Sequence, residues 1–433
     1  MCPVKAPLIH IRFFRVNDVV NFLRQFAHRP QRLWVRQLNF QVHLWVGITL
    51  SLYMIVIGAT GAILVFRAEL ESLSGLNPWH NIKATGPFAD IMAVINNVKA
   101  AYPKGQIISV FTPTEGEPTF VAIVQSISWS RTEIRVAADP ATGAVLGEFP
   151  RNDSWLRVVT RLHETLLMGA VGRRVNGGGA AFLLLLNITG LVVWWPGIQS
   201  WVRALKVDFR RKWRRVNFDL HRAVGFWTLA ISSFWAVSGI YFGWPAQTFA
   251  WVQKISPIVA VRPPVVSVLP QRDSAPPDLD ALISQASLID RGSRLMGVAF
   301  PSTRRAPLRI LMRRRPGPGY EYADSLFFDP YDGKYLAIWR YGINQTLGDW
   351  FIWLQIPLHF GTYWGRGVKV LWAAAGLAIV LLTVTGALMY WNRALRRKWK
   401  HLRAEHTHKK EDSKQPVSQR GSLRDRCPVR TPP

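Results

Sequence analysis

Four long apolar segments dominate this sequence and limit the folds that it can adopt. They cover residues 40–66, 180–195, 223–244 and 368–391, and almost no charged residue interrupts them. Most are close to the roughly 20 residues that an α-helix needs to cross a bilayer. The composition agrees, because 49% of the residues are hydrophobic and only 18% are charged. The sequence therefore excludes a purely soluble protein and predicts an α-helical integral membrane protein with four main transmembrane helices.

The basic residues predict the orientation of these helices. The formal net charge of +28 is concentrated in residues 1–39 (seven Lys and Arg against one acidic residue), 203–222 (eight against two) and 392–433 (thirteen against four). The positive-inside rule places these three segments, and hence both termini, in the cytoplasm. Two long loops, residues 67–179 and 245–367, are then expected outside. Most of the net charge thus indicates topology and contact with membrane lipid.

Two further features bear on the termini. A basic tail that binds nucleic acid is the competing interpretation of the C-terminal charge, but we favour a solvated tail beside anionic lipid and expect no nucleic-acid partner. The basic N-terminus and the uncleaved apolar segment after it predict a retained signal anchor. The only cysteines, Cys2 and Cys427, fall on the predicted cytoplasmic side. The outside loops therefore contain no disulfide and no site for covalent haem attachment.

The chain contains an internal repeat. The pattern Asn-Phe-x-x-His-x-x-x-Gly occurs at residues 39–47 and again at 217–225. A second pattern begins with Leu-His and ends with Thr-Gly, and it occurs at residues 162–190 and 358–386. Each copy contains two apolar segments, so both copies start on the same side of the membrane. We therefore expect a parallel repeat about an axis along the membrane normal.

Each outside loop is predicted to form a small domain with one helix and an antiparallel sheet. Helical spacing of apolar residues precedes alternating runs in both loops, and Asp-Pro followed by glycine marks a turn near residues 139 and 329. The predicted helices cover residues 88–102 and 277–289, and the predicted strand pairs are 120–125 with 133–137 and 308–312 with 326–328.

Four of the ten histidines lie at matched positions of the repeat. His43 and His221 lie near the cytoplasmic start of their spans, whereas His163 and His359 lie just before the outside start of theirs. Twofold symmetry would bring the members of each pair together. Two opposed neutral imidazoles suit the axial positions of one haem iron, whereas a structural zinc ion needs four ligands. The alternative is a hydrogen-bonded structural role for each histidine.

Four glycines mark helix faces that a flat ring could approach. Two of them lie one turn after His43 and His221, on the same face. The other two lie 18 residues after these histidines, which on straight helices is the same face about 27 Å further along. Close packing between helices is the alternative explanation of such small residues. The four are Gly47, Gly225, Gly61 and Gly239.

Together these residues resemble the PepSY-associated transmembrane family, and within it the inner-membrane ferric-siderophore reductases. The resemblance covers roughly residues 36–395 and includes the histidine and glycine patterns, Trp194-Trp195 and the two Asp-Pro-x-x-Gly turns. It implies two periplasmic PepSY-like α+β domains and a location in the bacterial inner membrane. It also implies two b-type haems with bis-histidine ligation, one held by His43 and His221 and the other by His163 and His359.

The predicted organisation follows from these arguments. It comprises a basic cytoplasmic N-terminus (1–39), a first transmembrane helix (40–66), a first PepSY-like domain (67–152), an interfacial helix with a second transmembrane helix (153–200), a basic cytoplasmic link (201–222), a third transmembrane helix (223–244), a second PepSY-like domain (245–348), an interfacial helix with a fourth transmembrane helix (349–392) and a basic cytoplasmic tail (393–433).

The sequence predicts a di-haem electron-transfer protein that reduces a periplasmic ferric siderophore or other ferric chelate and releases Fe(II). No phosphate-binding loop is present, so the donor is expected to be a quinol or a separate cytoplasmic reductase. The alternative is a non-redox membrane protein whose PepSY domains bind or regulate an envelope protein or peptidase. A small transporter is disfavoured, because no span carries an acidic residue. Basic and aromatic residues that could dock an anionic chelate are Arg313, Arg314, Arg315, Tyr320, Trp350 and Trp353.

Overall fold

The computed structural model describes residues 16–73, 77–83, 86–114, 117–126, 133–149, 155–259, 277–313, 323–340, 342–362 and 366–395. The chain divides into two compact units. Unit 1 comprises Met1–Met54, Ile188–Leu229 and Ala378–Pro433, and unit 2 comprises Ile55–Asn187 and Ala230–Leu377. Each unit contains one of the two histidine pairs.

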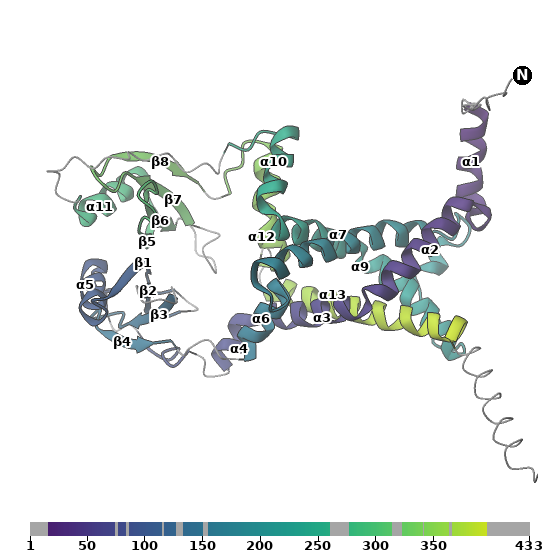
Figure 1. The fold of residues 1–433 in the computed structure, drawn as a ribbon, viewed down its shortest axis with the longest axis horizontal. Coiled ribbons are helices and arrows are strands. Elements are labelled where there is room, and N and C mark those ends of the chain that lie inside the picture. Colours follow the sequence, from purple (N-terminus) through teal and green to yellow (C-terminus); the bar gives the residue numbers. More distant parts are fainter. Residues whose placement is uncertain are drawn as a thin grey trace, which may run out of the picture. The chain divides into compact units, whose positions relative to one another are not determined.

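Three helices are long and apolar enough to cross a membrane (Figure 1). They are α7 (Gly169–Trp194), α9 (Trp213–Gly243) and α13 (Arg366–Tyr390), and the π-helical turn η3 (Trp391–Leu395) follows α13. Helix α9 begins inside the predicted cytoplasmic link, ahead of the predicted third span. The chain is therefore a membrane protein, in agreement with the apolar segments of its sequence.

The first predicted span is bent. It consists of α2 (Trp34–Thr49) and α3 (Ser51–Leu64), whose axes differ by 68°. At the break, the Ser51 hydroxyl donates a hydrogen bond of 2.9 Å to the Ile48 carbonyl, and back-bonding of this kind bends helices. The assumption that one straight helix joins His43 to Gly61 is therefore wrong. If the pair α2 and α3 counts as one span, the described residues contain up to four spans.

Several shorter helices complete the helical part. They are α1 (Val16–His28), η1 (Pro30–Arg32), α4 (Arg67–Leu73), α6 (Trp155–Thr165), α8 (Trp201–Ala204), α10 (Pro245–Ile255) and α12 (Leu347–His359). Helix α12 begins with a capping box, in which the Thr346 and Asp349 side chains accept hydrogen bonds from each other's backbone N–H groups. The Asp349 carboxylate also accepts a hydrogen bond of 2.9 Å from Val259 N–H, which holds the start of α12 against the residues after α10.

Each of the two long loops contributes one helix and four strands. The first contains α5 (Ile91–Ala101), β1 (Gly105–Phe111), β2 (Phe120–Ser126), β3 (Glu133–Ala138) and β4 (Val145–Glu148). The second contains α11 (Leu279–Ile289), β5 (Arg294–Ala299), β6 (Leu308–Arg313), β7 (Ala323–Phe328) and β8 (Tyr335–Trp339). The predicted helices and strand pairs of both loops are confirmed.

The two sets of strands form one continuous antiparallel sheet with the order β4-β3-β2-β1-β5-β6-β7-β8. Strands β1 and β5 join the halves, with Val110 opposite Val298. A Cβ on Gly297 of β5 would lie 2.6 Å from the Val110 carbonyl oxygen, so glycine permits this close approach. Each half thereby loses an exposed strand edge that could aggregate. The two loops, expected as separate domains, therefore share a sheet.

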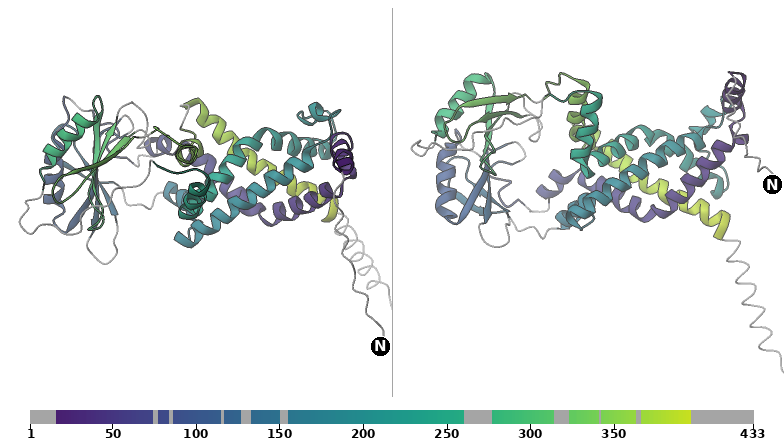
Figure 2. Two further views of the ribbon diagram at one scale, coloured as in Figure 1. Left: turned by 90° about the horizontal axis from the view of Figure 1, so that it is seen from above. Right: turned by 45° about the horizontal axis from the view of Figure 1, so that its top comes forward.

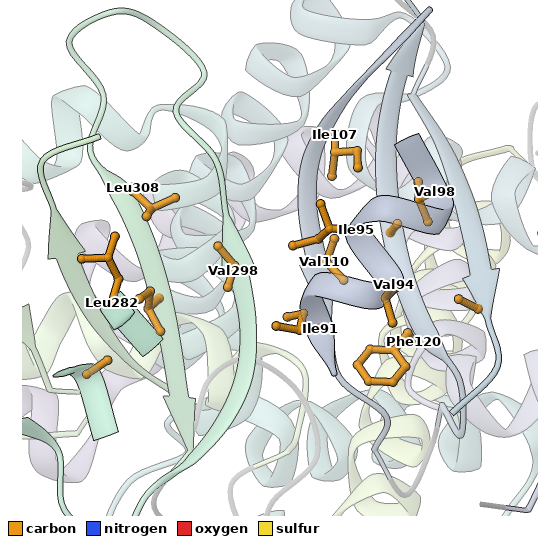
Figure 3. Packing of buried hydrophobic residues seen from close by; sticks show 14 of the residues in the cluster. Ile91, Val94, Ile95, Val98, Ile107, Val110, Phe120, Leu282, Val298 and Leu308 are labelled. Carbon is orange, nitrogen blue, oxygen red and sulfur yellow. The ribbon is translucent and has the colours of Figure 1, made fainter. Parts of the chain in front are cut away.

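Helices α5 and α11 lie on the same face of the sheet, as both views of Figure 2 show. A single hydrophobic core joins them to the strands (Figure 3). It includes Val94 and Val98 of α5, Ala286 of α11 and Val298 of β5, all fully buried. Burial of a valine side chain contributes about 1.5–3 kcal/mol relative to exposure. The α+β character predicted for the loops is thus confirmed.

The two Asp-Pro turns form as predicted. Asp139 accepts hydrogen bonds from the N–H groups of Ala141 and Thr142 at 2.9 and 2.8 Å. These bonds favour the charged carboxylate and lower the pKa of Asp139. Gly143 and Gly333 close the two turns with φ angles of +70° and +73°, which glycine adopts without strain.

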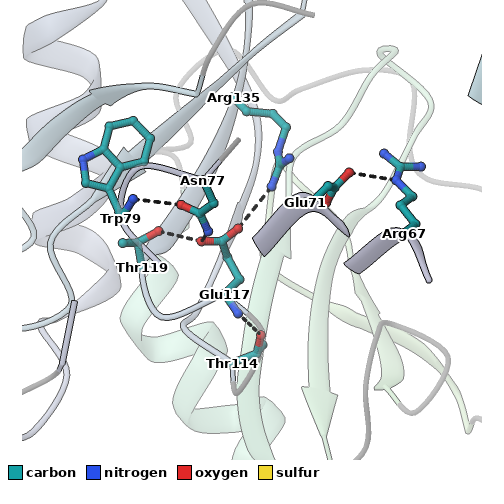
Figure 4. A network of polar contacts seen from close by, with 8 residues as sticks. All are labelled: Arg67, Glu71, Asn77, Trp79, Thr114, Glu117, Thr119 and Arg135. Atoms are coloured by element: carbon teal, nitrogen blue, oxygen red, sulfur yellow. Dashed lines mark hydrogen bonds and ion pairs between the residues drawn. The ribbon is translucent and has the colours of Figure 1, made fainter. Parts of the chain in front are cut away.

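A polar network centred on Glu117 holds the segment that follows α4 (Figure 4). The Glu117 carboxylate accepts hydrogen bonds from Asn77 at 2.9 Å and Thr119 at 3.2 Å, and it pairs with Arg135 at 3.5 Å. Desolvation by burial is the largest influence on this carboxyl and raises the pKa of Glu117 despite these partners. The network therefore ties Asn77 to the sheet.

Candidate metal-binding histidine pairs

The structure brings the four predicted histidines together as two pairs. In unit 1, His43 of α2 faces His221 of α9 with 6.3 Å between ring centroids and an interplanar angle of 85°. In unit 2, His163 of α6 faces His359 of α12 with 6.4 Å between centroids and an angle of 59°. The pairing predicted from the repeat is therefore present in both units.

A hydroxyl group holds the Nδ1 atom of each histidine. In unit 2, Thr60 Oγ1 lies 3.0 Å from His163 Nδ1, and Ser238 Oγ lies 2.6 Å from His359 Nδ1. Both hydroxyls also donate to backbone carbonyls of their own helices, Thr60 to Val56 at 2.6 Å and Ser238 to Trp235 at 3.1 Å. A hydroxyl has one proton to donate, so it must accept from Nδ1–H. This tautomer leaves the lone pair on Nε2.

The same arrangement occurs in unit 1. Thr385 Oγ1 lies 3.0 Å from His221 Nδ1 and donates its own proton to the Leu381 carbonyl at 2.7 Å. The Leu382 carbonyl, which can only accept, also lies 3.0 Å from His221 Nδ1. His221 Nδ1 is therefore protonated, and Nε2 carries the lone pair. Thr189 Oγ1 lies 3.2 Å from His43 Nδ1. Such outer partners fix the tautomer and orientation of metal-binding histidines.

Three glycines next to these hydroxyl residues make room for imidazole rings. A Cβ on Gly61 would lie 3.0 Å from His163 Cε1. Added Cβ atoms on Gly190 and Gly386 would lie 3.1 Å from His43 Cε1 and 3.3 Å from His221 Cε1. Each Thr-Gly pair thus supplies a hydrogen bond and a close packing surface to one histidine.

The other predicted glycines lie in different surroundings. A Cβ on Gly239 would lie 2.7 Å from Ala180 Cβ, so Gly239 permits α9 to pack closely on α7. A Cβ on Gly225 would make an ordinary contact of 3.6 Å with Leu382. Gly47 is half-buried on α2. Of the four predicted glycines, Gly61 is thus the one at which the structure shows space for a histidine ring.

Burial keeps the imidazoles of unit 2 neutral. His163 and His359 lie outside the membrane-spanning helices, and desolvation lowers the pKa of His163 to about 4 and of His359 to about 3. Phe242 packs edge-on against His359 with 5.1 Å between ring centroids. A neutral imidazole is the form that binds a metal ion.

The set of donors is limited to two imidazoles in each unit. Among the described residues, no group of three or more His, Cys, Asp or Glu side chains could surround a metal ion. A structural zinc site needs four such ligands. The arrangement can therefore supply two nitrogen ligands to a metal whose remaining positions are filled by another molecule.

The hydroxyl partners were missed as functional residues by the sequence argument, although the signal was visible. The repeat contains Thr-Gly or Ser-Gly four times, and of these pairs only the glycines Gly61 and Gly239 were predicted to have a role. The residues concerned are Thr60, Thr189, Ser238 and Thr385.

The predicted docking residues are only partly described. Arg313 ends β6, and its guanidinium lies 3.4 Å from Met296 Sδ. Trp350 and Trp353 lie on α12 with 5.3 Å between ring centroids, and Trp350 is exposed. Arg314, Arg315 and Tyr320 lie outside the described residues. The docking surface therefore stays a prediction.

The apolar helices, the α+β sheet and the paired histidines define a class of protein, namely a membrane protein with a mixed helix and sheet domain in its loops. The chain belongs to the PepSY-associated TM region family, whose model matches residues 40–393. This match confirms the family predicted from the sequence. A search of curated proteins finds no significant match.

Proposed function

We propose that the chain is a transmembrane electron-transfer protein that binds two b-type haems, one between the histidines of each pair. The observation that supports the proposal most directly is the hydrogen bonding and tautomer of the imidazoles. Hydroxyl groups engage Nδ1 of all four rings, and the tautomer deduced for His163, His221 and His359 leaves Nε2 as the ligand atom.

The separation of the rings fits this proposal. A metal–imidazole bond is about 2 Å long, so two bonds and two ring radii of about 1.1 Å separate the centroids by about 6 Å. The observed values are 6.3 Å for the pair in unit 1 and 6.4 Å for the pair in unit 2. Two axial histidines and no further protein ligand are what a low-spin haem requires.

Bound haem would supply a one-electron carrier. The contribution of this chain would be to hold each iron with fixed, neutral imidazoles and to keep the ligand nitrogens deprotonated. Two such sites suit transfer across a bilayer whose hydrocarbon core is about 30 Å thick. We further propose a parallel twofold repeat, an inner-membrane location with cytoplasmic termini, and a periplasmic sheet domain.

The substrate belongs to the same proposal. We infer that the electrons reduce a ferric siderophore or another ferric chelate and release Fe(II), with a quinol or a cytoplasmic reductase as donor. The support is the family resemblance together with the exposed Trp350 on α12. A non-redox role in which the sheet domain binds an envelope protein or peptidase gives no purpose to the two histidine pairs or to the free Nε2 atoms deduced for His163, His221 and His359.

A visible difference spectrum of the purified full-length chain tests the proposal. We expect a low-spin b-type signal with close to two haems per chain. His80 provides a matched control, because it is exposed and bonds only to the Asn77 carbonyl among the interactions of the described residues. The variant His80→Ala should keep both haems. Absence of any haem from a folded chain would overturn the proposal.

A further inference from the structure

The two histidines of unit 1 share one more sequence feature, an arginine seven residues earlier. Arg36 precedes His43 on α2, and Arg214 precedes His221 on α9. Seven residues are close to two helical turns, so each arginine lies on the face of its histidine, about 10 Å nearer the start of the helix. The repeat therefore places one cation from each helix on the same side of the histidine pair.

Arg36 has unused hydrogen-bonding capacity. Its Nη2 atom donates to the Val193 carbonyl at 2.7 Å, near the end of α7. Its Nε atom is buried and has no hydrogen-bond partner among the residues that the structure describes. A buried donor without an acceptor costs about 1–3 kcal/mol, and more when the group is charged. The Nε atom of Arg36 is thus still available to an acceptor from another molecule.

Three neighbouring arginines are different because each of them has an acidic partner. Arg211 pairs with Asp208 at 3.0 Å. Arg215 and Arg222 both pair with the buried Asp219 at 3.1 Å. Among the described residues, no acidic side chain pairs with Arg36 or Arg214. Arg36 and Arg214, unlike these three arginines, therefore each keep a cation to neutralise, and they occupy matched positions of the repeat.

We propose that Arg36 and Arg214 bind the two propionate carboxylates of a haem held between His43 and His221. This inference rests on the proposed function. A b-type haem carries two propionates on one edge, and the two arginines present two cations on one side of the pair. Charge-assisted hydrogen bonds from arginine to a carboxylate are among the strongest in proteins and are often bidentate. The arginines are thus positioning residues that set the rotation of the ring.

Redox titration of the full-length chain in nanodiscs, followed by visible spectroscopy, tests the proposal. Arg36→Gln and Arg214→Gln should each lower the midpoint potential of one of the two haems. A cation near the ring stabilises the reduced haem relative to the oxidised haem, and each substitution removes that stabilisation. The same haem should leave the protein about tenfold faster in transfer to apomyoglobin, as expected for the loss of one charge-assisted bond. Arg36→Lys should restore most of the potential and less of the retention. His43→Ala identifies which transition belongs to unit 1.

Arg211→Gln is the matched control, because it removes the same charge from the same basic region at an arginine that already has a partner. If Arg36→Gln and Arg214→Gln behave like this control in a chain that holds two haems, the inference is wrong and the proposed function stands. If their effects vanish in nanodiscs of zwitterionic lipid without net charge, the arginines act through anionic lipid headgroups and the inference is also wrong. A chain without haem would instead overturn the proposed function. The haem of unit 2 reports on folding in every variant.

Discussion

The histidine pairs of the two units are held in the same way but carried by different elements. In unit 1 the histidines lie on the long helix α9 and on α2, and the hydroxyl groups come from α7 and α13. In unit 2 the histidines lie on the short helices α6 and α12, and the hydroxyl groups come from α3 and α9. The hydrogen-bonded Thr or Ser, rather than the type of helix, therefore defines how the imidazole is presented.

The largest effect is expected from removal of a ligand. His359→Ala should abolish the haem of unit 2 and leave that of unit 1, and His43→Ala should do the reverse, because each pair has its own partners. Haem content from the pyridine haemochrome spectrum should fall from two to one per chain. Loss of both haems, or of neither, in a variant that remains folded would show that the pairs are not independent sites.

A large effect is also expected when the space beside one ring is filled. Gly61→Ala should displace His163, because the added Cβ would lie 3.0 Å from its Cε1 atom. Overpacking of this kind costs about 1–3 kcal/mol. The haem of unit 2 should be released faster, as measured by transfer to apomyoglobin. Gly225→Ala is the matched control, because its Cβ would make an ordinary contact at 3.6 Å. Equal release from both variants would contradict the assigned role of Gly61.

Removal of a hydroxyl group should affect the two histidine pairs to different extents. Ser238→Ala takes from His359 the only hydrogen-bond partner described for its Nδ1, and such changes typically weaken metal binding 10–100-fold. Thr385→Val should cost less, because His221 Nδ1 keeps the Leu382 carbonyl at 3.0 Å. Retention of haem by the two variants provides the measurement, and Ser238→Thr should restore it. A greater loss in Thr385→Val would reverse the comparison.

The smallest effect is expected from helix caps in the sheet domain. Asp90 caps α5 by accepting a hydrogen bond from Met92 N–H at 3.0 Å, and Asp278 caps α11 in the same way at 3.1 Å. Asp90→Ala or Asp278→Ala should lower stability by about 1 kcal/mol. Thermal unfolding followed by circular dichroism should show the decrease, with both haem spectra unchanged. A changed spectrum would indicate that the sheet domain influences the histidine pairs.

Much of this architecture was predictable because it depends on local patterns. The apolar segments predicted the long helices, and the Asp-Pro turns predicted Gly143 and Gly333 at positive φ. The bend between α2 and α3 was not predictable, since a lone serine in an apolar segment is compatible with a straight helix. The pairing of β1 with β5 was missed for a similar reason. Either strand could have remained an edge of a separate sheet. The need for glycine at position 297 is visible only once Val110 of β1 lies against it.

The membrane character, the family and the four matched histidines follow from the amino-acid sequence, because hydropathy and spacing are properties of the chain alone. The tertiary structure decided which nitrogen of each imidazole is engaged and which glycine lies against which ring. These facts depend on helices distant in the sequence, as when Thr60 meets His163 and Ser238 meets His359. A hydrogen bond of about 3 Å requires atomic positions that only packing fixes.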